Sequence, residues 1–289
     1  MKSLVWFITG ASRGFGLEIA RAALERRDSV VAAARDPKVV EGALGQREQL
    51  MAVELDVTDE RQAQSAVSAA FERFGQIDVL VNNAGRGLLG AVEEASAEEV
   101  RSVFAVNVDG LLNVTRMVLP SMRARRSGRI LNLSAVGGFD AWPGWGVYCA
   151  TKFAVEGLSE ALRAELLPLG IHVTIIEPGT LRTDFLDASS LWRAARSSTT
   201  TAAAAAARDN GLTRRITINS AIRSKALPPS WRLPRAQNLL RACSWEPILL
   251  RGLKRNSLKW RRSSPPGERW RSPRTTTRPG LRHRYRRFD

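Results

Sequence analysis

The sequence predicts an α/β fold in which helices cover both faces of a doubly wound parallel sheet. Along the first two thirds of the chain, short apolar runs rich in β-branched residues alternate with amphipathic stretches, as strands alternate with helices around a parallel sheet. The apolar runs are nearly continuous rather than interrupted at every second position, which is expected of strands that helices bury on both sides. Six such runs occur in order, enough for a doubly wound sheet.

Each expected strand is one of these short apolar runs. Helical patterns follow the first run at Gly14–Arg26 and the third at Thr58–Phe74, and we expect Thr58 to be the N-cap because a threonine hydroxyl can accept a hydrogen bond from the first helical turn. A further helical pattern starts at Tyr148 and runs to Leu167. The six predicted strands are Val5–Thr9, Val30–Ala34, Met51–Leu55, Ile77–Val81, Gly128–Leu133 and His172–Glu177.

The chain changes character after Asp187. Residues 1–189 hold 20 Lys/Arg and 24 Asp/Glu, a net charge of −4, whereas residues 190–289 hold 24 and 4, a net charge of +20. Beyond Asp187 no helical or strand period is sustained; Ala202–Ala207 is a short helical candidate and Ile216–Ile222 a poor strand candidate. We therefore predict an α/β core over 1–187 and a basic tail of low order over 188–289. Our hypothesis is that this arginine-rich tail results from a GC-rich gene read out of frame.

The basic tail also leaves a nucleic-acid-binding function open. Its 24 Lys/Arg and five Trp could contact phosphates and stack on bases. No recognised nucleic-acid-binding module occurs in it. We expect only a non-specific affinity for polyanions that is lost as salt rises, and no specific nucleic-acid partner.

Composition excludes several other classes. The two cysteines, Cys149 and Cys243, are far apart and lack metal-ligand spacing, so we expect neither a disulfide framework nor a metal site, and a reducing cytoplasm fits best. The apolar start of the chain is short and enters a glycine turn, which indicates a buried strand rather than a signal peptide. No stretch approaches the roughly 20 apolar residues of a membrane span, and we predict none.

A glycine-rich turn between the first strand and first helix predicts a dinucleotide site. The segment Thr9–Gly16 places glycines where the backbone can approach a pyrophosphate at a helix N-terminus. An acidic residue that would bind the ribose 2′-OH of NAD is missing from the end of the second strand, where Ala34 stands. Arg35 follows it and Arg13 lies in the glycine turn, so two guanidinium groups are expected to converge on the 2′-phosphate of NADP(H).

Tyr148 and Lys152 form the expected chemical centre. Residues four apart lie on one face of a helix. A nearby ammonium favours a phenolate, so we expect the pKa of Tyr148 to fall from its ordinary value toward the operating pH, which would make it a general acid or base. Taken alone, such a pair could also be a solvated surface pair.

Residues 4–187 resemble the short-chain dehydrogenase/reductase family, whose sheet is of the Rossmann type. The motifs that carry the resemblance occur in order. They are Thr9–Gly16, Asp56-Val57, Asn82–Gly85, Asn107, Tyr148 with Lys152, and Pro178-Gly179 leading to Thr183. Two further stretches, Gly87–Gly90 and Val147–Gly157, are most similar to hydroxysteroid and retinol dehydrogenases.

The resemblance implies a reaction and a set of roles. Tyr148 would exchange a proton with a carbonyl or secondary alcohol while NADP(H) exchanges hydride, Lys152 would lower the pKa of Tyr148 and bind the nicotinamide ribose, and Asn107 would hold a relay water. The Asn82–Gly85 run could instead merely brace the sheet, and Asn107 could be a satisfied polar residue of its helix. The cofactor would contact Gly10, Ser12, Arg13, Phe15, Gly16, Arg35, Asp56, Val57, Asn83, Ala84, Gly85, Tyr148, Lys152, Pro178, Gly179 and Thr183.

Two departures from the family pattern leave alternatives open. The family's serine thirteen residues before the tyrosine is Ala135 here. The neighbouring Ser134 is the candidate substrate-binding residue, although it is expected to face away from the substrate site unless the loop shifts. The family's substrate lid and final strand are not found after Asp187. The chain is therefore interpreted as an NADP(H)-dependent oxidoreductase of a small apolar carbonyl or alcohol, or as a catalytically impaired NADP(H)-binding relative. The resemblance also implies a homo-oligomer.

Overall fold

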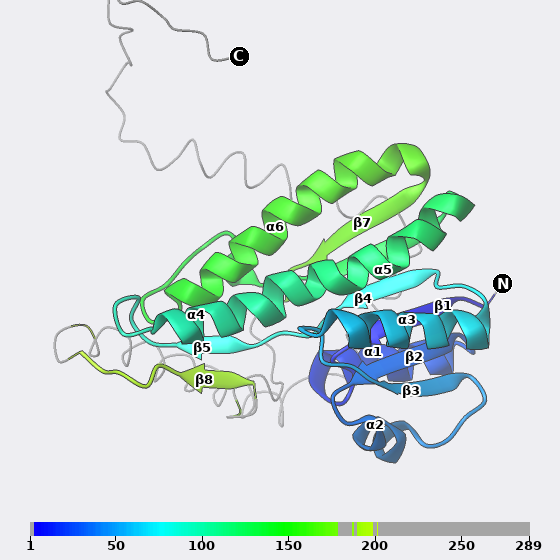
Figure 1. Ribbon diagram of the computed structural model, residues 1–289, viewed down its shortest axis with the longest axis horizontal. Coiled ribbons are helices and arrows are strands. Elements are labelled where there is room, and N and C mark those ends of the chain that lie inside the picture. The colour runs from blue at the N-terminus through cyan, green and yellow to red at the C-terminus, as the bar shows by residue number, and fades with distance from the viewer. Residues whose placement is uncertain (1–2, 179–186, 188–189, 199–200, 202–289) are drawn as a thin grey trace, which may run out of the picture. The chain divides into compact units, whose positions relative to one another are not determined.

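The computed structural model describes residues 3–178, 187, 190–198 and 201, and within them a six-stranded parallel sheet forms the centre of the fold (Figure 1). The strand order is β3-β2-β1-β4-β6-β7, with the chain reversing direction across the sheet after β3. All five strand pairings in this sheet are parallel. The strands are β1 (Val5–Thr9), β2 (Ser29–Ala34), β3 (Leu50–Glu54), β4 (Val79–Asn82), β6 (Gly128–Leu133) and β7 (Ile171–Ile176).

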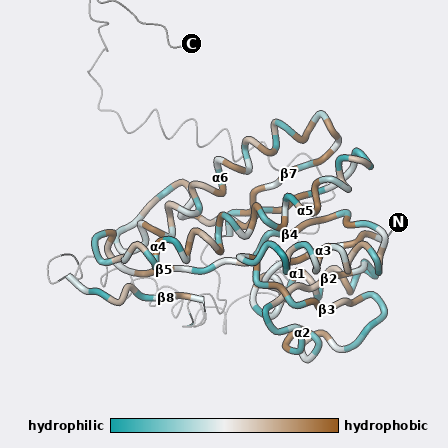
Figure 2. The backbone as a smooth tube through the Cα atoms, viewed as in Figure 1, coloured by the Kyte–Doolittle hydropathy of each residue, from teal (hydrophilic) through white to brown (hydrophobic). Residues whose placement is uncertain are grey.

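Helices cover both faces of the sheet, and alternate residues of one strand supply the two cores. Trp6 and Ile8 of β1 pack with α1 (Gly14–Glu25) and α2 (Pro37–Leu44) on one face. Phe7 packs on the other face with α3 (Glu60–Phe74), α5 (Gly110–Arg125) and α6 (Gly146–Leu166). Hydrophobic stretches of the chain accordingly recur along strands such as β7 (Figure 2). The predicted doubly wound α/β class is confirmed.

All six predicted strands are confirmed, with ends displaced by two residues at most. The predicted N-cap of α3 is wrong. The Asp59 carboxylate, not Thr58, accepts hydrogen bonds from the Arg61 and Gln62 backbone N–H groups. Thr58 instead donates from its hydroxyl and its backbone N–H to Asp56 Oδ1. Two adjacent residues could each have capped the helix, and the hydrogen bonds of Thr58 to Asp56 decide between them.

A continuous helical run joins α4 to α5 beside the site. It comprises α4 (Ala97–Phe104), a π-helical turn at Ala105–Asp109 and α5. By length and composition alone the run Ala97–Arg125 could cross a membrane, since an 18-residue window within it has a mean hydropathy of 1.2. Because α5 also supplies Val114 to the core beneath it, a core helix accounts for the same apolar content. The absence of a membrane span stays a prediction.

A second, two-stranded sheet lies outside the main one. Strand β5 (Gly87–Leu89) pairs in parallel with β8 (Leu191–Arg193). Strand β8 follows Asp187, beyond which the sequence predicted a tail of low order with only a poor strand candidate at Ile216–Ile222. The sequence did not indicate β8, because three residues are too few to show a period. Short 3₁₀ turns complete the described elements at Val136–Gly138 and Leu167–Leu169. The candidates Ala202–Ala207 and Ile216–Ile222 lie outside the described residues.

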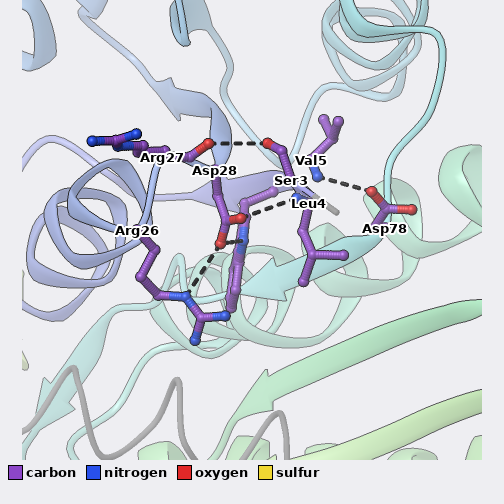
Figure 3. A network of polar contacts seen from close by, with 8 residues as sticks. Ser3, Leu4, Val5, Arg26, Arg27, Asp28 and Asp78 are labelled. Atoms are coloured by element: carbon purple, nitrogen blue, oxygen red, sulfur yellow. Dashed lines mark hydrogen bonds and ion pairs between the residues drawn. The ribbon is translucent and has the colours of Figure 1, made fainter. Parts of the chain in front are cut away.

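Two carboxylates, the buried Asp28 and the half-buried Asp78, fix the start of β1 (Figure 3). Asp28, 3% exposed, accepts hydrogen bonds from the Leu4 backbone N–H at 3.0 Å and from Trp6 Nε1 at 3.1 Å. Arg26 Nε lies 3.5 Å from the same carboxylate. Asp78 accepts from the Val5 backbone N–H at 2.9 Å. These carboxylates satisfy backbone and indole donors that burial would otherwise leave unpaired.

Candidate active site

A cleft of about 450 Å³ lies where β1, β2 and β4 end. The carboxyl ends of parallel strands on either side of a reversal in strand order form a crevice that commonly binds ligands. Residues of the glycine turn line the cleft together with residues that follow β2, β3 and β4. Ten of the predicted cofactor residues lie in its wall: Gly10, Ser12, Arg13, Phe15, Arg35, Asp56, Val57, Asn83, Ala84 and Gly85.

Two glycines of the turn are required by its geometry. Gly10 has a φ of 64°, in the left-handed region that side chains disfavour. Gly16 lies in the first turn of α1, and a Cβ there would stand 2.5 Å from both Asn83 Nδ2 and the Gly10 carbonyl oxygen. Gly16 is not among the residues that line the cleft. Its lack of a side chain allows α1 to approach the turn closely.

Asn83 braces the turn as well as lining the cleft. Its Nδ2 donates to the carbonyl oxygens of Thr9, at 2.9 Å, and Gly10, at 3.0 Å. In return, Thr9 Oγ1 accepts from the backbone N–H groups of Asn83 and Ala84. The sequence left bracing and cofactor lining as alternatives for the Asn82–Gly85 run, and the structure shows that the two are compatible.

The N-terminus of α1 is suited to an anion. Gly14 and Phe15 of its first turn line the cleft, the first turn contains no acidic residue, and the N-cap residue Arg13 makes no capping hydrogen bond from its side chain. Backbone N–H groups at such a terminus favour negative charge. Together with the close backbone approach at Gly16, this arrangement fits the phosphates of a dinucleotide.

Three arginines line the cleft, one more than the sequence analysis identified. Arg13 Nη2 donates to Ser190 Oγ at 2.8 Å, and Arg35 is exposed at the end of β2. Arg86 is half-buried, with its guanidinium carbon 3.4 Å from the centroid of the Trp192 ring. Burial and the nearby charge of Arg35 lower the pKa of Arg86, so these two cations lie close enough to interact. The motif pattern stopped at Gly85 and gave no reason to single out Arg86.

Asp56 lies beside these cations. Burial tends to raise its pKa, but hydrogen bonds from Thr58 and the charges of Arg35 and Arg86 bring the pKa below its ordinary value. The carboxylate is therefore ionised and partly balances the arginines. Net positive charge remains around this end of the cleft, as an anionic ligand requires.

Tyr148 and Lys152 lie on α6, and Lys152 lies near Gly85 of the cleft wall. Both are buried, and a Cβ at Gly85 would stand 3.8 Å from Lys152 Nζ. Lys152 Nζ donates to the Leu133 carbonyl oxygen at 2.7 Å and lies 5.9 Å from the centroid of the Tyr148 ring. Burial lowers the pKa of Lys152 from 10.5 to about 8, against the opposing effect of Glu156.

The expected fall in the pKa of Tyr148 is wrong for this structure. Burial raises the pKa of Tyr148, and the neighbouring Cys149 thiol adds to the rise. The phenol packs in an apolar cluster with Trp145, whose ring meets it edge to face at a centroid distance of 5.6 Å. Loss of hydration therefore outweighs the ammonium of Lys152, which donates to a carbonyl oxygen instead.

Asn107 lies in the π-helical turn, and both hydrogens of its side-chain amide are donated in hydrogen bonds. Its Nδ2 donates to the Arg86 carbonyl oxygen and to Thr151 Oγ1, both at 2.9 Å, and its Oδ1 accepts from the Arg86 backbone N–H at 2.8 Å. The side chain thus ties the segment after β4 to α6. This agrees with the alternative of a satisfied polar residue, and Oδ1 keeps the capacity to accept a second hydrogen bond.

The comparisons with known proteins agree with this geometry. A family model described as short chain dehydrogenase matches residues 4–194. The chain belongs to the short-chain dehydrogenase family. Members bind a nicotinamide cofactor and are oxidoreductases, which agrees with the glycine turn and cleft described above.

The similar proteins include a hydroxysteroid dehydrogenase, a complex with NAD and a complex with NADP. Human 17-beta-hydroxysteroid dehydrogenase type 1 is 42% identical over 200 residues, which cover 65% of this chain and 60% of that protein. A short-chain dehydrogenase from Burkholderia phymatum in complex with NAD has a TM-score of 0.65 at 30% identity, covering 74% of this chain and 79% of that one. ElxO with NADP bound has a TM-score of 0.61 at 30% identity, covering 64% and 77%.

This short-chain dehydrogenase departs from its family beside Tyr148. Ala135 packs against the apolar cluster that contains Tyr148. Ser134 is turned the other way: its Oγ and Glu156 Oε1 both lie within 3 Å of the position that a Cβ on Gly138 would take. The sequence expectation that Ser134 faces away is confirmed, so its assignment as a substrate-binding residue finds no support. Of the remaining predicted residues, Pro178 lies after β7 outside the cleft lining, and Gly179 and Thr183 lie outside the described residues.

Proposed function

We propose that this chain is an NADP(H)-dependent oxidoreductase that reduces a carbonyl group to a secondary alcohol, or catalyses the reverse reaction. The observation that carries the proposal is the continuity of the site. Gly10, of the cradle at Gly10–Gly16, lines the same cleft as Gly85, a Cβ on Gly85 would stand 3.8 Å from Lys152 Nζ, and this Nζ lies 5.9 Å from the centroid of the Tyr148 ring. A cofactor held by its phosphates at the cradle would therefore have room to extend toward Lys152 and Tyr148.

Tyr148 and Lys152 have different roles in the proposed proton transfer. The bound cofactor supplies or accepts hydride. The raised pKa of Tyr148 keeps the phenol protonated, which is the form that donates a proton to a carbonyl oxygen. Lys152, held by the Leu133 carbonyl oxygen, supplies positive charge that favours the phenolate left behind.

The cofactor is proposed to be NADP(H) rather than NAD(H). Ala34 provides no carboxylate at the end of β2, and Arg13, Arg35 and Arg86 line the same cleft. A 2′-phosphate suits guanidinium groups through charge-assisted, two-point hydrogen bonds. The relatives include one structure with NAD and one with NADP, so this choice depends on the arginines.

The substrate is proposed to be apolar. Around Tyr148 the structure gathers Leu89, Trp145 and Leu191, with Trp142 and Ala135 packed against them. A substrate that approaches the phenol would meet these side chains, and apolar and aromatic surroundings favour ligands of the same character. The name of the human relative, a hydroxysteroid dehydrogenase, agrees with a bulky apolar alcohol or ketone.

A cofactor-consumption assay tests the proposal. The full-length protein is incubated with NADPH or NADH and a panel of apolar and polar ketones and aldehydes, and loss of the reduced nicotinamide absorbance is followed. We expect turnover with an apolar ketone and a preference for NADPH. Absence of both turnover and NADPH binding would remove the proposal.

A second candidate function is that of a catalytically impaired cofactor-binding protein. Ala135 offers no hydroxyl where it packs near Tyr148, and Ser134 is directed at Glu156 instead. Loss of one hydrogen-bond donor to a developing oxyanion typically lowers kcat about 10²–10³-fold. The Ala135→Ser variant separates the two functions: a rise in kcat of this order with unchanged NADPH affinity identifies an enzyme core that lacks one group.

A further inference from the structure

Glu156 continues the face of α6 that carries Tyr148 and Lys152. The three residues follow one another at intervals of four, so their side chains stack along one side of the helix. Lys152 Nζ is held by the Leu133 carbonyl oxygen at the end of β6. The next residue, Ser134, stands opposite Glu156, since a Cβ on Gly138 would meet Ser134 Oγ at 2.6 Å and Glu156 Oε1 at 2.8 Å.

Ser134 Oγ and Glu156 Oε1 are both buried and have no well-formed hydrogen bond among the described residues, although the Ser134 hydroxyl lies near enough to favour the ionised carboxylate of Glu156. Ser134 Oγ and Glu156 Oε1 share this property with only one other side-chain atom there, Asn82 Oδ1. A buried polar atom without a partner is costly, and such atoms call for a functional explanation. Glu156 has one at hand, because the buried ammonium of Lys152 lies one helical turn away and needs a counter-charge.

We propose that Glu156 is a positioning residue that keeps Lys152 in its charged form next to Tyr148. The inference rests on the proposed function in one respect, that a charged Lys152 serves Tyr148. Asn107 cannot supply the charge, since it is neutral and its side chain is occupied by Arg86 and Thr151.

The groups around Glu156 act in opposite directions. Burial raises the pKa of Glu156, and the negative charges of Glu160 on the same helix and Glu177 after β7 raise it further. The Ser134 hydroxyl and the Lys152 ammonium favour the ionised carboxylate. In turn, the carboxylate raises the pKa of Lys152, in opposition to the larger effect of burial. Charge on Lys152 and charge on Glu156 therefore depend on each other.

A direct titration of Lys152 tests the proposal without any need for turnover. The full-length chain, which contains six lysines, is labelled with carbon-13 at lysine Cε, and the Lys152 resonance is identified by its loss in Lys152→Arg. We expect an apparent pKa of about 8 in the wild type. In Glu156→Gln the midpoint should fall by about one unit or more, because an opposite charge nearby typically shifts a pKa by one to three units.

Glu160→Gln is the matched control, since it removes a carboxylate one turn further along α6 and should lower the Lys152 midpoint little. Glu156→Met gives a second uncharged variant in case Glu156→Gln folds poorly. An unchanged Lys152 midpoint in either folded Glu156 variant would overturn the proposal, even if the chain proves inactive.

If turnover is observed, the pH profile of kcat/KM gives a second test. The alkaline limb should move to lower pH in Glu156→Gln by the same amount as the Lys152 titration, and stay in place in Glu160→Gln. A purely structural role for Glu156 would lower kcat/KM at every pH and leave the limb where it is.

Discussion

Replacement of Lys152 by methionine should stabilise the folded protein at neutral pH. Lys152 is 6% exposed, and burial lowers its pKa from 10.5 to about 8. Between these two values the unfolded chain binds a proton that the folded chain does not, so stability rises with pH across this window. Below pH 8 both states are protonated, and the folded state bears the full cost of the buried charge.

The size of the effect follows from the shift in pKa. Each unit corresponds to about 1.4 kcal/mol, so the change from 10.5 to about 8 amounts to roughly 3 kcal/mol at pH 7. The variant also loses the hydrogen bond to the Leu133 carbonyl oxygen, which is worth about 1 kcal/mol. Lys152→Met should therefore be about 2 kcal/mol more stable than the wild type at pH 7, and slightly less stable above pH 10.5.

Urea unfolding at pH 7, 8, 9 and 10 measures this difference. Burial raises the pKa values of Tyr148 and Cys149, which lowers stability at alkaline pH, but both groups are present in the two proteins and cancel in the difference. Lys38→Met, at an exposed position of α2, is the control and should show no such dependence. A difference in unfolding free energy between wild type and Lys152→Met that stays constant from pH 8 to pH 10 would show that burial does not lower the pKa of Lys152.

Three further variants test other parts of the structure. Gly16→Ala places a Cβ 2.5 Å from Asn83 Nδ2, so NADPH affinity should fall at least about tenfold and stability by about 1–3 kcal/mol, whereas Gly42→Ala, with no atom within 4 Å of the new Cβ, should change neither affinity nor fold. Asp28→Ala leaves a backbone and an indole N–H buried without an acceptor, and its urea midpoint should correspond to a loss of about 2–4 kcal/mol. Arg35→Ala should weaken NADPH binding about tenfold or more in a fluorescence titration and leave NADH binding nearly unchanged; equal losses for both cofactors would contradict the 2′-phosphate assignment.

The sheet could be predicted from sequence because buried parallel strands leave a direct trace. Runs such as Val5–Thr9 and Gly128–Leu133 are mostly apolar, and the structure has strands with the same bounds. The glycine turn was likewise predictable, since glycine is the residue that adopts a φ of 64°, as at Gly10, most easily. Strand β8 could not be predicted, because three residues are too few to show a period and its pairing with β5 depends on a distant segment.

The surroundings of individual side chains could not be predicted from the sequence. The spacing of Tyr148 and Lys152 predicted an interaction but not its outcome, because the apolar cluster around Trp145 that raises the pKa of Tyr148 is assembled from separate elements. Arg86 follows a recognised motif but gains its place in the cleft by stacking on Trp192 of β8. In both cases the deciding contact is tertiary, and no local pattern records it.

The most direct test of the account compares wild type with Tyr148→Phe in two measurements on the same samples, NADPH binding and ketone reduction. We expect Tyr148→Phe to bind NADPH as well as the wild type does, because the phosphate cradle is intact. Its turnover should fall about 10²–10⁴-fold, because removal of the phenolic hydroxyl removes the proton donor. Undiminished ketone reduction by Tyr148→Phe, or failure of the folded wild type to bind NADPH, would contradict the account.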